Sequence, residues 1–168
     1  ESAIHLTFQP HQALTLVYSR GGSPFGGASP VEQREAFGKL AIPGDGYLKI
    51  GRFRNPFGLR MDDHTVATRN GFLDFTSAGR YLPEDPRLTD AGVEYGLNFG
   101  SFFGQFAFTN GNSDVFFGNT FAETKAAKVG MNHSMYQGGI SFYDDFQKNP
   151  GFGTPNRSTR WASYALTH

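Results

Sequence analysis

The stretch GVEYGLNFGSFFGQFAFT, residues 92–109, decides the fold class of this chain. Large apolar residues alternate with glycine or polar residues on both sides of the central pair Gly100-Ser101. Alternation with a period of two is typical of a β-strand that has one apolar face. A glycine-containing pair between two such runs is typical of a two-residue hairpin turn. The stretch therefore predicts an antiparallel β-hairpin.

The same alternation recurs along the chain, and no segment shows a convincing helical period. The pattern predicts a single all-β domain over residues 1–168 with about nine strands. The expected strands cover residues 4–9, 13–19, 34–43, 47–54, 92–99, 102–109, 124–133, 137–143 and 158–167.

The connections between these strands fall into two length classes that alternate along the chain. The short connections are 10–12, 44–46, 100–101 and 134–136, and the long ones are 21–33, 55–90, 110–123 and 144–157. In an up-and-down meander this order places all short turns at one end of the sheet and all long loops at the other. That asymmetry is typical of outer-membrane barrels. We therefore expect an antiparallel up-and-down transmembrane β-barrel, or a portion of a larger one.

Composition and motifs exclude several function classes. The chain has 15 basic and 15 acidic residues, whereas nucleic-acid-binding domains usually have a basic excess. It has no cysteine, which excludes disulfides, thiolate metal sites and cysteine nucleophiles. No serine-hydrolase elbow, zinc-protease motif or phosphate-binding loop is present. We therefore expect no enzymatic activity, no cofactor, no metal site and no nucleic-acid partner.

Alternation by itself does not distinguish a membrane barrel from a soluble β-sandwich, in which the apolar face packs inward. Three features favour the barrel: strands of about 8–10 residues, aromatic residues near the ends of the apolar faces, and opposite faces rich in glycine and polar residues. The residues expected to face lipid are Val93, Tyr95, Leu97, Phe99, Phe106 and Phe108. Those expected to face the lumen are Glu94, Asn98, Gln105 and Lys128.

A second stretch, GYLKIGRFRNPFGL at residues 46–59, resembles bacterial outer-membrane porin-like barrels, including the phosphate-selective porin type. Such proteins carry a strand of the form G-x-L-K-x-G-R-F-x-x-P-F-G-L that leads into a long loop. The resemblance covers roughly residues 34–112 and implies location in the bacterial outer membrane. Proteins of this type are usually much longer and have more strands, so the resemblance also implies an incomplete barrel chain.

The basic residues of this stretch suggest a site on the barrel wall. Strict alternation would place Arg52 and Arg54 on the apolar face, where an arginine near the middle of the bilayer costs about 2–4 kcal/mol. A β-bulge at Gly51 would shift the alternation by one residue. Lys49, Arg52 and Arg54 would then face the lumen, and Phe53 would face outward.

Together with Arg60, these residues would form a basic strip on the pore wall, and rings of basic residues favour anions. The alternative is that the arginines lie at the level of the lipid headgroups or pair with Glu94 and with Asp62 and Asp63. Both interpretations remain open from the sequence.

The long connection 55–90 contains the cluster Asp62, Asp63 and His64. Connections of this length are commonly functional. The cluster could form a constriction inside the lumen or lie over its mouth, and paired carboxylates could bind a divalent cation. The alternative is a solvated loop held by aspartate–arginine pairs.

Three functions remain as hypotheses. The first is an outer-membrane pore for passive passage of ions or small hydrophilic solutes, anion-favouring through the basic strip. The second is a structural barrel sheath around a partner such as a multihaem cytochrome. The third is a soluble β-sandwich module that binds carbohydrate. For the first two, the expected partners are the lipid bilayer and further copies of the chain or other membrane subunits.

Overall fold

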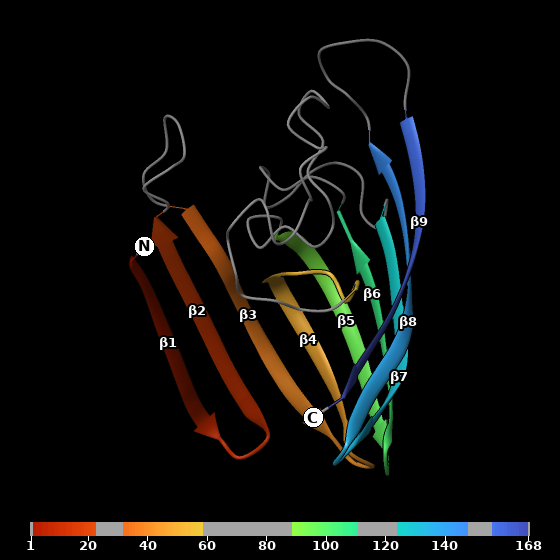
Figure 1. Cartoon of the computed structure of the whole chain (residues 1–168). Helices are drawn as coiled ribbons and strands as arrows, with labels where there is room; N and C mark the ends of the chain where they lie inside the picture. The colour runs from red at the N-terminus through yellow and green to blue at the C-terminus, as the bar shows by residue number, and fades with distance from the viewer. Residues whose placement is uncertain (1, 23–31, 59–88, 111–123, 148–155, 168) are drawn as a thin grey trace.

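A computed structural model of the chain describes residues 2–22, 32–58, 89–110, 124–147 and 156–167. They form one antiparallel sheet in which nine strands pair in chain order (Figure 1). The strands are β1 (Ser2–His11), β2 (Leu14–Gly22), β3 (Glu32–Ile42), β4 (Gly46–Phe53), β5 (Asp90–Phe99), β6 (Phe102–Thr109), β7 (Thr124–His133), β8 (Tyr136–Gln147) and β9 (Asn156–Thr167). The predicted all-β, up-and-down arrangement is thus confirmed. No helix in this part of the chain is long and apolar enough to cross a membrane.

Four tight turns lie at one end of the sheet, at the bottom of Figure 1. Two of them depend on residues that accept a left-handed backbone: Gly44 and Asp45 have φ angles of 87° and 58°, and Gly100 has a φ of 58°. Glycine and aspartate tolerate this region better than most residues. The opposite strand ends lead into the longer connections, as the sequence predicts.

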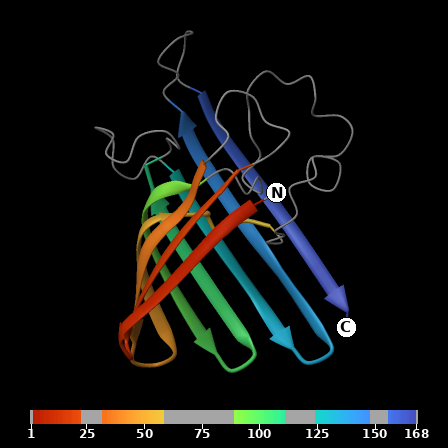
Figure 2. The same ribbon diagram turned by 90° about the vertical axis from the view of Figure 1, so that its left-hand side faces the viewer.

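The sheet is strongly curled rather than flat (Figure 2). Glycines on its concave face allow close approach between neighbouring strands. A Cβ atom on Gly96 would lie 2.2 Å from the ring of Tyr47, and one on Gly130 would lie 2.4 Å from the carbonyl oxygen of Gly138. Because no side chain larger than hydrogen fits there, aromatic rings of adjacent strands lie directly over the backbone. The ring of Phe103 covers Gly130 in the same way.

The two faces of the sheet differ in polarity, and the apolar face is the exposed one. Large hydrophobic side chains are exposed on the convex face, with Phe99 84% and Trp161 72% exposed. The buried residues of the concave face are mostly polar or charged, and Glu94 is only 1% exposed. A small apolar cluster of Phe53, Ala107 and Ala126 lies among them. This is the reverse of a soluble sandwich, whose apolar faces are buried between sheets.

Neighbouring hairpins are staggered by a constant amount. A row of paired residues crosses Tyr18, Ala36, Arg52 and Ala91. Counted from the tight-turn end of each strand, the row lies four residues up in β2, six in β3 and β4, and eight in β5. A two-residue step also separates the hairpin β5–β6 from the hairpin β7–β8. The strands are therefore tilted with respect to the row of turns.

Candidate functional site: the concave face of the sheet

A buried charged cluster lies on β4, β5 and β6 in the middle of the concave face. The Lys49 ammonium donates a hydrogen bond to Glu94 Oε1 at 2.7 Å, and Tyr47 Oη donates to the same oxygen at 2.6 Å. Gln105 Nε2 donates to Tyr47 Oη at 2.8 Å. Lys49 and Glu94 are direct cross-strand partners, which explains how both reach the same point. The lysine charge is thus neutralised by the glutamate.

Aromatic rings lie beside Lys49 of this cluster and beside the neighbouring Lys39. The Lys49 ammonium lies 5.1 Å from the ring centroid of Phe37 and 5.0 Å from that of Phe53. Lys39 extends over the ring of Tyr47 at 4.2 Å. A cation over an aromatic face gains attraction from the ring quadrupole. These rings hold the two ammonium groups near the wall of the concave face.

Residues 54–58 leave the end of β4 and cross the concave face toward β7 and β8. The Gly58 amide donates to Ser141 Oγ at 2.9 Å, and Lys128 Nζ donates to the Gly58 carbonyl at 2.9 Å. Phe57 packs edge-to-face on Tyr143 at 5.7 Å between centroids. Residues 54–58, the inward segment, therefore connect the end of β4 with β7 and β8, which lie three and four positions away in the sheet.

Three of the predicted lumen-facing residues, Glu94, Gln105 and Lys128, lie on the concave face with hydrogen bonds across it. Asn98 shares this face by register but lies at the tight-turn end, where its side chain donates to the carbonyl of Asp45. Lys128 also lies over the ring of Tyr164 at 4.6 Å. The residues predicted to face lipid lie on the convex face. They are Val93, Tyr95, Leu97, Phe99, Phe106 and Phe108.

The alternation of β4 differs from the prediction. Pairing with β3 and β5 continues through Gly51 without a register shift, so the predicted bulge is absent. Arg52 therefore shares the face of Ile50, and Phe53 shares the face of Lys49 and is fully buried. A bulge would be needed only if Arg52 lay at mid-height on the apolar face. It lies instead at the loop end of β4, where its Nε donates to Thr89 Oγ1 at 2.7 Å.

The predicted basic strip is not continuous in the described residues. Lys49 lies on the concave face, whereas Arg52 has the opposite register. Arg54 belongs to the inward segment, where its backbone amide donates to Glu35. Arg60 and the cluster Asp62, Asp63 and His64 lie outside the described residues. In the described ranges, no three histidine or acidic side chains gather as a metal site.

Two features of this face were not predicted from the sequence. Lys39 is one of them, although its position diagonal to Tyr47 follows from the turn that joins β3 to β4. The other is the contact of Gly58 with Ser141, residues 83 positions apart for which no local pattern exists.

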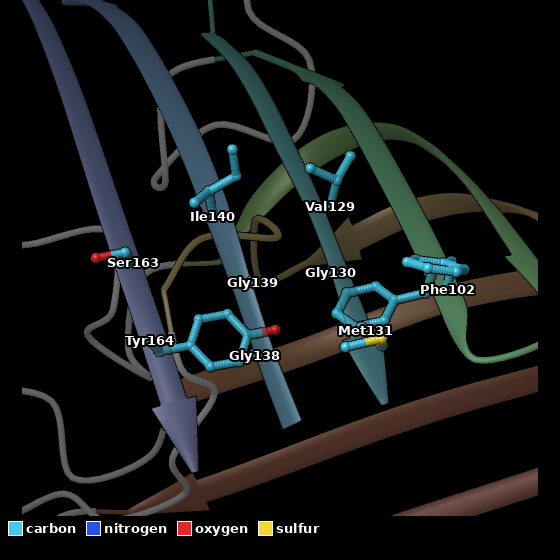
Figure 3. Close-up of a pocket in the computed structure, with 10 residues that line it drawn as sticks. Phe102, Val129, Gly130, Met131, Gly138, Gly139, Ile140, Ser163 and Tyr164 are labelled. Atoms are coloured by element: carbon cyan, nitrogen blue, oxygen red, sulfur yellow. The ribbon is translucent and has the colours of Figure 1, made fainter. Parts of the chain in front are cut away.

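A hollow of about 610 Å³ lies between β6 and β9 (Figure 3). Its floor includes Gly130, Gly138 and Gly139, and apolar side chains such as Val129 and Ile140 stand around it. No charged side chain lines the hollow. The polar side chains of its lining are the hydroxyls of Ser163 and Tyr164.

Comparison with known proteins assigns no family to this arrangement. No protein-family model, curated protein or solved structure matches the chain.

Proposed function

We propose that this sheet is part of the wall of a porin-like barrel in a bacterial outer membrane, through which ions or small hydrophilic solutes pass passively. One observation carries the proposal: the exposed face is apolar across all nine strands, while the polar and charged side chains are buried on the concave face. Apolar-out and polar-in is the arrangement expected of a membrane barrel.

The stagger of the strands supports a barrel. A step of two residues of about 3.4 Å over two strand spacings of about 4.8 Å corresponds to a tilt of about 35°. Strands in closed barrels tilt by roughly 35–45°. The sheet curls toward closure (Figure 2), and its polar side chains are the buried ones on the concave side.

The distribution of charge on the convex face supports contact with a bilayer. The register places four charged residues on the convex face, and all four lie well above the tight turns. Arg20 and Arg52 are six residues above the turn end of their strands, and Lys125 and Asp144 are eight residues above it. Below this rim the strands present an uncharged apolar band that is about 20–27 Å long along the strands and, at a tilt of about 35°, about 17–22 Å tall. Outer-membrane barrels have an apolar band about 25 Å tall. Arginine costs only about 0–1 kcal/mol near the membrane interface, which suits Arg52 at the rim.

The inward segment favours a pore over a sheath. Gly58 occupies the concave face and is bonded to β7 and β8. A sheath for a folded partner needs this space free. The pairing of Lys49 with Glu94 also favours weak ion selectivity over strong anion preference, because the two charges cancel.

The proposal is tested by placing one positive charge on each face in turn. Ile140 is exposed at mid-height on the convex face, whereas Thr7 is exposed at mid-height on the concave face. We expect Ile140→Arg to destabilise the membrane-inserted protein by about 2–4 kcal/mol. We expect the matched control Thr7→Arg to insert as well as the unsubstituted protein. Membrane-integrated yield and denaturant unfolding in detergent measure both.

Planar-bilayer recording completes the test. We expect discrete conductance steps from protein that requires detergent to remain monodisperse. Protein that is monodisperse in plain buffer would instead support a soluble sandwich, whose apolar face packs against a second sheet. Detergent-dependent protein without conductance would support the sheath.

A further inference from the structure

The outermost strands of the sheet, β1 and β9, are each paired on one side among the described residues. Both are long, with 10 and 12 residues. Edge strands in proteins that stay unpaired are usually short or shielded by charge. β1 carries no lysine, arginine or acidic residue, and β9 carries none from Trp161 to Thr167. Pro10 and the register irregularity between Phe8 and His11 discourage pairing at the turn end of β1, whereas residues 2–8 and 161–167 carry neither charge nor proline and can pair with a further strand.

The exposure of β1 is consistent with a missing neighbour. Ile4, Leu6 and Phe8 are 63%, 58% and 63% exposed, more than most apolar residues of the inner strands. An unpaired edge is also costly inside a bilayer, because no water is available to its N–H and C=O groups. In the proposed membrane setting, both edges therefore require partners.

The directions of the two edges restrict these partners. Because nine strands alternate in direction, β1 and β9 run the same way (Figure 1). Direct pairing of β1 with β9 would thus be parallel. A second copy in the same membrane orientation would also place its β1 parallel to β9 of the first. Bacterial single-chain outer-membrane barrels contain even numbers of antiparallel strands.

We infer that the outer edges of β1 and β9 are joined by an antiparallel ribbon with an odd number of strands. Each strand of this ribbon alternates apolar residues toward lipid with polar residues toward the concave side. The inference rests on the proposed function and adds the kind of partner that completes the wall. An odd ribbon pairs antiparallel with both edges and gives an even total.

Residue-resolved hydrogen exchange of the full-length protein in detergent tests whether the edges are paired. The relevant amides are those of β1 and β9 that do not bond to β2 and β8. We expect them to exchange at least tenfold more slowly than amides of exposed turns. Exchange as fast as in the turns would overturn the inference, whatever the conductance of the protein.

Cysteine pairs test what lies next to each edge, and the absence of native cysteine makes them unambiguous. His5→Cys or Thr7→Cys is combined with Ala162→Cys or Tyr164→Cys, all on the concave face by register. The positive control combines Thr7→Cys with Val17→Cys, which are cross-strand partners. We expect a disulfide in the control and none between β1 and β9.

A β1–β9 disulfide within one chain would show direct closure, and one between two chains would show pairing of copies. Either result would overturn the odd ribbon while leaving the proposed pore in place, since conductance is measured separately. Slow exchange at both edges without a β1–β9 disulfide supports the ribbon. Denaturing mass spectrometry of the purified assembly then identifies the polypeptide that carries it.

Discussion

Glu94 organises the polar side of the sheet at the scale of single residues. It is almost completely buried and accepts hydrogen bonds from both Lys49 and Tyr47. Removing one member of a buried ion pair leaves the other charge without compensation, which is more damaging than losing a surface pair. A substitution that breaks this pair therefore tests how much water reaches the concave face.

We expect Glu94→Gln to lower the free energy of unfolding by about 3 kcal/mol, because the buried Lys49 ammonium loses its counter-charge. The matched control is Asp45→Asn, which removes the same charge from an exposed turn and keeps a residue that tolerates φ of 58°. Denaturant unfolding in detergent measures both variants. Equal stability of the two would mean that water already screens Lys49.

Glycine positions provide a second prediction at this scale. A Cβ on Gly130 would lie 2.4 Å from the Gly138 carbonyl oxygen and 2.7 Å from the Phe103 ring, whereas one on Gly104 finds its nearest neighbour at 3.5 Å. We expect Gly130→Ala to destabilise the sheet by about 1–3 kcal/mol. Gly104→Ala should be neutral or slightly stabilising, because alanine loses less backbone entropy. A thermal melt that ranks Gly104→Ala below Gly130→Ala would contradict the close packing.

The inward segment 54–58 is the feature of interest at the scale of elements. Two hydrogen bonds hold it to β7 and β8: Lys128 donates to the Gly58 carbonyl, and the Gly58 amide donates to Ser141. We expect the double variant Lys128→Met with Ser141→Ala to speed exchange of the Gly58 amide about tenfold, since a hydrogen bond contributes about 1 kcal/mol. In a planar bilayer, the same variant should raise the conductance of each step.

The control for this prediction is Lys39→Met with Ser163→Ala. These changes match the first pair in chemistry but contact neither Gly58 nor its partners in the described structure. We expect the control to leave exchange at Gly58 and conductance unchanged. An identical effect of both double variants would show that lost charge, rather than release of the segment, is responsible.

Elements were also the level at which the sequence was most informative. The hairpin at 92–109 could be predicted because alternation and turn chemistry are local properties. The strands Phe102–Thr109 and Thr124–His133 have the predicted bounds. The turn at Gly100-Ser101 sets the register between β5 and β6, and this register places Glu94 and Gln105 on one face of the sheet. No tertiary contact has to be known for this prediction.

The position of the inward segment 54–58 could not be predicted in this way. Its hydrogen-bond partners lie 70 and 83 residues away in the sequence. The prediction for Gly51 was wrong for a related reason. The depth of Arg52 depends on the stagger of the whole sheet, and a bulge was invoked to relieve a cost that applies at mid-height. Periodicity gives the face of a residue but not its height.

At the scale of the whole molecule, the direction of the faces has a further consequence. Most water-soluble proteins fold because their interior removes apolar side chains from water. In the described part of this chain, the dry cluster is limited to Phe53, Ala107 and Ala126, while most large hydrophobic residues point away from it. In aqueous buffer, hydrophobic burial within this part of the chain therefore contributes little to the free energy of folding. In the proposed membrane setting, the thermodynamic stability of the fold depends jointly on the polypeptide and on the surrounding hydrocarbon, so a melting temperature measured in one detergent will not transfer to another.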